Sequence, residues 1–390
     1  MKTTYTIKNI LYRNLFILLT SFSLFYSCAN ENNKIVLNTP VKINLQQGTE
    51  NVKNLINKID LKKVIPLNLS DSSSISSWFY IKKILHINNN FYLLDTKFMT
   101  ISVFNTNGKH LFNIGKLGTR IGQFSNVQDM VYSPTNKSIM VLCNRPNKIV
   151  EYDLFGTFIK EHYPTFFSSN FEIESPNRYY FYTNANHTTS SQKKDLLRTD
   201  SLLRIESRLF PPKDGQNTSI ASYGGLFKST NGEIYFNRPY ERDIYQMKNG
   251  NAVMSYQVDF GKEENIDSVN FDLIETYRKT KSSLTNKLFF TENYIGLNYQ
   301  KRGLSVFSLY EPKTNLTYST DFQDSPVMLF THGVYFSDGK LIVMFNPRSK
   351  KKIIDKHKSL ILSKYPELAE AISTTSNKNN PYLLIFDIKK

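Results

Sequence analysis

The sequence predicts an all-β fold, a six-bladed β-propeller with two short helical insertions, preceded by a lipoprotein signal peptide and a polar tether. Three observations lead to the propeller. Aromatic and β-branched residues gather in short segments between turn residues, one segment type recurs six times, and its copies average 50 residues apart. Blades of four strands have periods of about 40–50 residues. We therefore divide the 390 residues into a short leader and one large repetitive domain.

The leader begins with a signal for export. Lys2, Lys8 and Arg13 precede an uncharged, mostly apolar run over residues 15–25. A basic start before an apolar run too short to span a bilayer is typical of a secretory signal peptide. Removing residues 1–27 takes away those three positive charges and no negative ones, so the formal net charge falls from +16 to +13. Because the protein is exported, nucleic acid is not an expected partner.

A cysteine follows the apolar run. Tyr26-Ser27-Cys28 places a small residue immediately before it, which resembles a bacterial lipoprotein signal of the looser kind found in Bacteroides-type bacteria. The resemblance implies that Cys28 is lipidated and anchors the protein in the outer membrane, facing either the periplasm or the cell surface. An ordinary signal peptide with a chance cysteine is the alternative. Residues 28–54, rich in Asn, Lys and Gln, are then a polar tether, and the propeller occupies residues 55–390.

The repeated segment predicts the second strand of each blade. A polar turn precedes every copy, and the continuous apolar runs suit strands that are covered on both faces. Two consecutive β-sandwiches or an open solenoid would not explain a count of six. The six copies are Phe91–Leu94, Ile139–Leu142, Tyr179–Tyr182, Ile234–Phe236, Ile295–Leu297 and Leu341–Met344.

A second marker predicts the third strands. Val103–Gly108 and Glu151–Gly156 match at an offset of 48 residues, and weaker versions follow in later repeats. The counterpart in the third repeat falls near residues 202–205. Residues 61–69 and 382–388 both read as strands, and together they could close the ring without a free edge. Apolar spacing predicts helical insertions over residues 266–277 and 353–372.

One connection supports a named resemblance. Gly115–Phe124, followed by the strand at Ile139 and by Asn147–Asp153, resembles an NHL-type propeller repeat. Residues 59–390 as a whole resemble the six-bladed propeller lipoproteins of Bacteroides-type bacteria. The resemblance implies the fold and the location in the cell envelope. It does not assign an activity to any particular residue.

Catalytic signatures are not evident in the sequence. The six histidines show no pair at metal-ligand spacing, and we expect neither a metal nor a cofactor from the motifs. The remaining thiol, Cys143, lies in an apolar run and is expected to be buried and inert. Some propeller enzymes hold a metal with carboxylates from separate blades, and Asp95 or Asp129 could serve in that way. A metal-dependent lactonase- or lyase-like enzyme therefore remains the alternative to a binding protein.

The loops after the repeated strands suggest a binding surface. In a propeller they lie on one face around the channel mouth, together with Lys97, Lys116 and Arg120. Arginine offers a planar fork for carboxylate or sulfate groups, and tyrosine offers a stacking face. Turn chemistry, with each arginine paired to a carboxylate of the next blade, is the competing interpretation. The candidate ligand-binding residues are Arg145, Arg238, Tyr240, Tyr299, Arg302 and Arg348.

The sequence thus favours an envelope-anchored lipoprotein that acts as a binding or scaffolding module. Anionic glycans are the favoured ligand class, and a role in an outer-membrane uptake complex is the other possibility. The basic run over residues 348–358 suggests either contact with anionic lipid headgroups or a solvated helix face.

Overall fold

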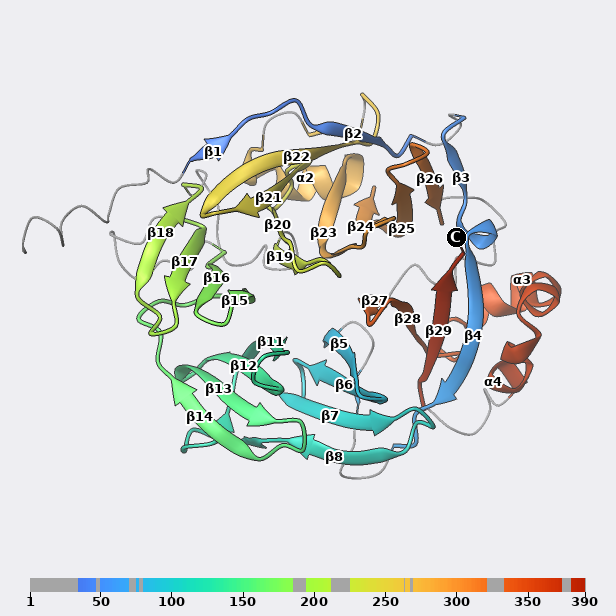
Figure 1. Cartoon of the computed structure of the whole chain (residues 1–390). Helices are drawn as coiled ribbons and strands as arrows, with labels where there is room; N and C mark the ends of the chain where they lie inside the picture. Colours follow the sequence, from blue (N-terminus) through green and yellow to red (C-terminus); the bar gives the residue numbers. More distant parts are fainter. Residues whose placement is uncertain are drawn as a thin grey trace, which may run out of the picture. The chain divides into compact units, whose positions relative to one another are not determined.

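Six sheets, each built on four strands, form the blades of a six-bladed β-propeller (Figure 1). The innermost strands contact each other in chain order, and the innermost strand of blade 6 contacts that of blade 1. The computed structural model describes residues 34–46, 50–69, 75–76, 80–184, 194–211, 225–262, 264–266, 269–320, 333–373 and 380–389. Cys28 and the predicted signal peptide lie outside the described residues. The predicted all-β propeller fold is confirmed.

Each of the first five blades takes its four strands in sequence. Blade 1 consists of β5 (Ile81–Ile87), β6 (Asn90–Asp95), β7 (Thr100–Asn105) and β8 (His110–Ile114). Blade 2 consists of β11 (Val127–Ser133), β12 (Ser138–Asn144), β13 (Asn147–Asp153) and β14 (Phe158–His162). Blade 3 consists of β15 (Asn170–Ser175), β16 (Arg178–Tyr182), β17 (Leu196–Asp200) and β18 (Ile205–Leu209). Blade 4 consists of β19 (Gly225–Lys228), β20 (Ile234–Asn237), β21 (Asp243–Lys248) and β22 (Asn251–Asp259). Blade 5 consists of β23 (Ser282–Phe290), β24 (Ile295–Lys301), β25 (Leu304–Glu311) and β26 (Leu316–Ser319).

Blade 6 closes the ring with strands from both ends of the described chain. Its inner strands are β27 (Val334–Ser337) and β28 (Lys340–Phe345), and its third strand is β29 (Tyr382–Ile388). The outermost strand is β4 (Ile59–Pro66), which pairs with β29 from Ile59 opposite Ile388 to Pro66 opposite Tyr382. This pairing confirms the predicted closure, in which β29 is paired on both sides and β4 forms the outer edge of the blade.

Three short strands precede β4 and lie outside the four-stranded pattern. β1 (Ile35–Val36) and β2 (Val41–Asn44) pair in parallel with β22, and β3 (Val52–Asn54) pairs in parallel with β26. The sequence predicts a polar tether over residues 28–54, but much of residues 35–54 adds strands to the outer edges of blades 4 and 5. Ile43 is fully buried there, so this segment is part of the folded body.

The repeated segments occupy the positions that the sequence predicts. All six lie in the second strands of their blades, where each backbone is hydrogen-bonded on both sides. The third-strand marker also lies in β7, β13, β21, β25 and β29. Blade 3 differs from the prediction, because its third strand is Leu196–Asp200, and residues 202–205 begin with the turn that follows it.

One helical insertion lies before blade 5, and the other lies within blade 6. The first contains η5 (Phe271–Leu273) and α2 (Ile274–Thr280), so it begins later than predicted. The second contains α3 (Lys351–Lys364), η7 (Pro366–Leu368) and α4 (Ala369–Ser373), and it packs on blade 6 through Ile361 and Leu368. A further short helix, η1, spans Leu55–Asn57, and β9 (Lys116–Leu117) pairs with β10 (Gln123–Phe124) before blade 2. No helix in the described ranges has the length and apolar character needed to cross a membrane.

Candidate functional site

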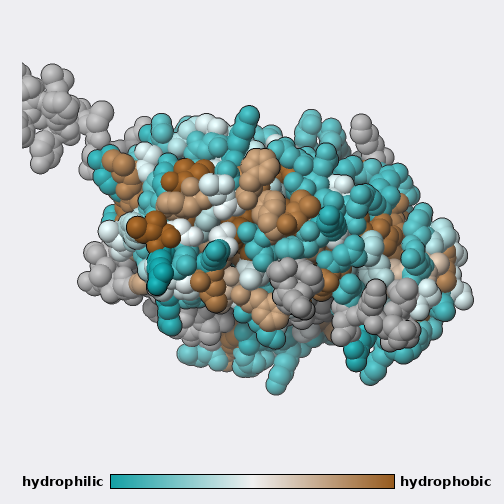
Figure 2. Space-filling view, turned by 90° about the horizontal axis from the view of Figure 1, so that it is seen from below, coloured by the Kyte–Doolittle hydropathy of each residue, from teal (hydrophilic) through white to brown (hydrophobic). Residues whose placement is uncertain are grey.

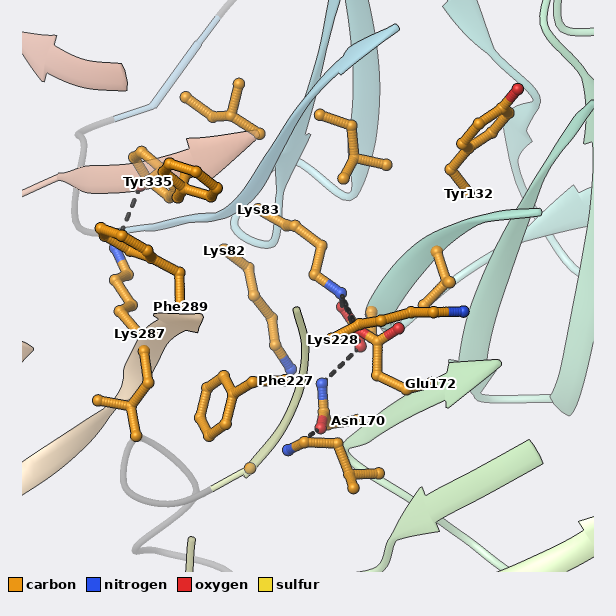
Figure 3. A pocket seen from close by; sticks show the side chains of 18 of the residues that line it. Lys82, Lys83, Tyr132, Asn170, Glu172, Phe227, Lys228, Lys287, Phe289 and Tyr335 are labelled. Atoms are coloured by element: carbon orange, nitrogen blue, oxygen red, sulfur yellow. Dashed lines mark hydrogen bonds and ion pairs between the residues drawn. The ribbon is translucent and has the colours of Figure 1, made fainter. Parts of the chain in front are cut away.

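The innermost strands of all six blades line a cavity of about 250 Å³ at the centre of the ring. Two consecutive lysines of β5, Lys82 and Lys83, both line it, which a regular strand would not allow because neighbouring side chains point to opposite faces. A register shift between Ile81 and Lys83 explains this, since a bulge re-aims side chains. The polar side chains of the cavity include those of Lys82, Lys83, Asp129, Asn170, Glu172, Lys228, Lys287 and Tyr335 (Figure 3).

One side of the cavity holds a paired network from blades 1 to 3. The Nζ atom of Lys83 lies 3.1 Å from Oδ1 of Asp129 and 3.4 Å from Oε1 of Glu172. Asn170 donates through Nδ2 to Oδ2 of Asp129 at 2.7 Å, and the backbone N–H of Met130 donates to Oδ1 at 2.9 Å. Burial raises the pKa of Glu172. Burial also opposes the charge of Lys83, but the two carboxylates outweigh it and raise the pKa of that lysine.

The other lysines of the cavity donate to neutral oxygens. Lys82 donates to the carbonyl of Ser169 at 2.6 Å, and Lys228 donates to the carbonyl of Ile173 at 2.5 Å. These two acceptors carry no full negative charge, while the charges of Asp129 and Glu172 attract Lys82 and Lys228 respectively. Burial lowers the pKa of Lys82.

Lys287 has the most apolar surroundings of the four. Its Nζ atom donates to Oη of Tyr335 at 3.2 Å and lies 4.3 Å from the centre of that ring. Tyr335 in turn donates to the carbonyl of Ile81 at 2.6 Å. Figure 3 shows the end of Lys287 beside Phe289 and directed toward Tyr335, away from the paired network around Glu172. Burial lowers the pKa of Lys287 to about 8.

The cavity therefore carries more positive than negative charge. Four lysines face two carboxylates, and the phenylalanines Phe227 and Phe289 supply apolar walls. Such a cavity suits an anion with an apolar face, because its negative charge would balance the lysines without removing the existing pairs. Within the described ranges, no group of three or more His, Cys, Asp or Glu side chains is placed to hold a metal ion.

The predicted rim arginines have different environments. Arg238 is buried, with Nη2 3.1 Å from Oδ2 of Asp195 and Nη1 3.3 Å from Oε1 of Glu241. Arg302 lies 3.3 Å from Oε1 of Glu264, although its side chain is 55% exposed. Arg145 and Arg348 are exposed.

The two predicted tyrosines lie within the protein. Tyr240 is 1% exposed and packs with Tyr277 and the helical insertion, and its Oη accepts from Nε of Arg278 at 3.4 Å. Tyr299 is also 1% exposed, with its ring 5.2 Å from that of Phe260. Neither ring presents a face to solvent. Ligand binding by these tyrosines and by the four arginines stays a prediction.

The two carboxylates considered as metal ligands, Asp95 and Asp129, lie in different environments. Asp95 closes a turn, where its Oδ1 accepts from the backbone of Lys97 and Phe98 at 2.9 and 3.0 Å. Asp129 does lie in the channel, beside Lys83. The sequence analysis missed the four channel lysines, and the only local signal for them was the pair Lys82-Lys83 at the start of a strand.

Cys143 is buried, and burial raises its pKa to about 12, so its thiolate is scarce at neutral pH.

Comparison with known proteins identifies the family. A family model described as "Domain of unknown function (DUF4934)" matches residues 40–387. The chain belongs to this family. No curated protein matches it significantly.

Two solved structures share the fold of this DUF4934 chain. A Bacteroides fragilis protein described as a "putative exported protein" is 19% identical, with a TM-score of 0.72, over 90% of this chain and 100% of the other. A DUF4221 family member from Bacteroides vulgatus is 11% identical, with a TM-score of 0.55, over 86% of this chain and 99% of the other. At these identities the likeness concerns the fold. The expected resemblance to propeller proteins of Bacteroides is confirmed at that level, and the NHL-like detail stays a prediction.

Proposed function

We propose that this protein is an exported lipoprotein of the outer membrane, anchored through Cys28, whose propeller binds an anionic ligand in the central channel. The predicted signal peptide, residues 1–27, and the cysteine that directly follows it support export and lipid anchoring. The description of the Bacteroides fragilis relative as exported agrees with it. The observation that carries the ligand proposal is the excess of lysines over carboxylates in a cavity lined by all six blades.

Acidic glycans are the ligand class that these residues favour. A uronate or sulfated sugar carries an anion for the lysines, hydroxyls for groups such as Asn170, and a C–H face that packs on an aromatic ring. Lys82 and Lys287 would contact the anion, since their present acceptors are neutral and easily replaced. The exposed Arg145 and Arg348 would attract the ligand toward the mouth of the channel from a distance.

A titration with defined polysaccharides tests the proposal. Alginate and dextran sulfate serve as anionic probes, neutral dextran serves as the uncharged control, and calorimetry gives the affinity. We expect binding of an anionic probe that weakens as salt rises, and no binding of neutral dextran. Lys287→Met should lower the affinity about tenfold, the cost of losing one charge-assisted contact.

Lys248→Met supplies the matched control for this titration. Lys248 is an exposed lysine at the end of β21 and lies outside the cavity, so its loss should leave the affinity within about twofold. Equal losses for Lys287→Met and Lys248→Met would place binding outside the channel. If replacing Arg145 alone lowered the affinity as much as Lys287→Met does, the result would instead support binding by the predicted arginines around the channel mouth.

A further inference from the structure

Exposed apolar side chains gather on the outer edge of blade 2. Of the seventeen large hydrophobic residues exposed in the described chain, six lie between residues 117 and 163. Phe155 is 80% exposed and Ile121 is 77% exposed, which is unusual for side chains of this size. We call this set the blade 2 patch, and its members are Leu117, Ile121, Phe155, Phe158, Ile159 and Tyr163.

The blade 2 patch is built from β14 and from the connection that enters the blade. Tyr152 donates to the carbonyl of Gly122 at 2.9 Å, and the Gly122 N–H donates to Glu161 at 2.9 Å, which holds the connection against β14. A side chain at Gly122 would meet the Phe158 ring at 3.2 Å, so the backbone next to Ile121 lies against that ring. Figure 2 is viewed from the side on which β8 and β14 lie in Figure 1, and it shows brown groups amid teal there.

The outer strands of blades 3 to 6 are covered or charged. β22 and β26 pair with the N-terminal strands β1 to β3, and β4 itself forms the outer edge of blade 6. The outer strand of blade 3, β18, instead exposes the charged side chains of Glu206 and Arg208. Charged residues on an edge strand discourage association. The edge strand of blade 2 also exposes Lys160, but Phe158 and Ile159 are exposed beside it, and this mixture of apolar and basic side chains favours a contact surface.

The start of the described body indicates what this surface meets. Cys28 precedes Ile35, the first residue of β1, by seven positions, a stretch that reaches at most about 25 Å when fully extended. The predicted tether of residues 28–54 would have allowed a much greater distance. A lipid on Cys28 therefore keeps the propeller close to the leaflet that holds it. Lys116 and Arg120, both exposed in the connection, add positive charge for lipid phosphates.

We infer that the blade 2 patch rests on the lipid surface in which Cys28 is anchored, with its aromatic side chains at the level of the headgroups. This inference rests on the proposed lipid anchor. Apolar and aromatic side chains beside basic ones are the combination that binds the surface of a bilayer without crossing it. Contact through an outer edge leaves both faces of the ring toward the aqueous phase, so the central cavity stays away from the lipid while the protein is docked.

Vesicle co-sedimentation of the mature chain, residues 28–390 with Cys28→Ser, tests the inference, because this chain lacks both the signal peptide and the anchor and keeps the patch. Vesicles contain phosphatidylethanolamine and phosphatidylglycerol at three to one. We expect the chain to bind them, and Ile121→Ser with Phe155→Ser to weaken the partition at least about tenfold, since each side chain buries apolar surface in the lipid. Leu304→Ser, a change at a 72% exposed leucine in blade 5, is the matched control and should have little effect.

Three results would overturn the inference. The Cys28→Ser chain could fail to bind the vesicles, or the blade 2 variant and the Leu304→Ser control could bind equally. In the third, sedimentation velocity would find a dimer that the blade 2 variant dissociates, which would assign the patch to a second copy of the chain. Mass spectrometry of lipid on Cys28 in the native protein and the channel titration are separate measurements, so failure of the proposed function is recognised independently.

Discussion

Two buried cations of this protein, Arg238 between blades 3 and 4 and Lys287 in the channel, have opposite surroundings. Arg238 contacts Asp195 and Glu241 and donates to the carbonyl of Pro211 at 2.8 Å. Lys287 contacts a phenol oxygen and an aromatic ring. The arginine is compensated by the protein itself, whereas the lysine leaves a charge that a ligand can neutralise.

This difference separates structural charge from functional charge. A buried ion pair contributes little net stability, but removing one partner leaves the other charged and buried, which is costly. A buried cation without an acidic partner costs stability in the folded protein and gives it affinity for anions. The two regions should therefore respond in opposite directions when the positive charge is removed.

The largest effect is expected at Arg238. Arg238→Ala removes the guanidinium that contacts the fully buried Asp195 carboxylate, and we expect a loss of about 3–5 kcal/mol in unfolding free energy. Urea denaturation followed by circular dichroism measures it. Arg204→Ala is the matched control, because it breaks an ion pair with Asp200 in which the arginine is 75% exposed, and it should cost less than about 1 kcal/mol. Similar losses for the two variants would contradict the structural role of Arg238.

A smaller loss is expected on the paired side of the channel. Asp129→Asn removes the charge that Lys83 contacts and places an amide where Asn170 now donates. We expect a loss of about 2 kcal/mol, the value of charge-assisted hydrogen bonds, with Glu172 left to compensate Lys83. Thermal unfolding of this variant and of Asp355→Asn, which affects a solvent-exposed helix pair, makes the comparison. An unchanged midpoint for Asp129→Asn would mean that the network is not coupled to folding.

The sequence predicts the architecture because blade strands repeat a pattern that packing requires. Ile139–Leu142 and its counterparts are buried on both faces, so each copy must be continuously apolar. The third strand of blade 3 escaped this reasoning because it is partly polar, with Arg198 donating to Glu174 at 2.8 Å. The strands β1 to β3 escaped it because they are short and lie among Asn, Lys and Gln.

The site is harder to predict than the fold. Its lysines come from the first strands of different blades, one or two from each, so no spacing rule connects them. Bulges decide which side chains of β5 face the cavity, and a bulge has no clear sequence signal. The arginines shared a recognisable loop, but the sequence could not distinguish Arg238, which pairs with Asp195, from the exposed Arg145.

The smallest effect, and the only gain, is expected at Lys287. Its pKa is lowered to about 8 in the folded protein, against an ordinary value of 10.5. Between these values the unfolded chain binds a proton that the folded protein does not, so this lysine makes the wild type more stable as pH rises from about 8 to 10.5. Below pH 8 both states are protonated and the folded protein carries the full cost of the buried charge.

Lys287→Met removes that cost and keeps the volume of the side chain. At pH 7 we expect the variant to be more stable than the wild type by about 1–2 kcal/mol, with the advantage shrinking as pH rises toward 10.5. Urea denaturation of both proteins at pH 7, 8, 9 and 10 measures the difference, and Lys248→Met should show no such trend. Because the same variant should bind anionic probes more weakly, a gain in stability together with a loss of affinity distinguishes a ligand site from a merely unpaired lysine. If Lys287→Met instead lost stability at pH 7, Lys287 would be a structural charge like Arg238, one that the fold requires.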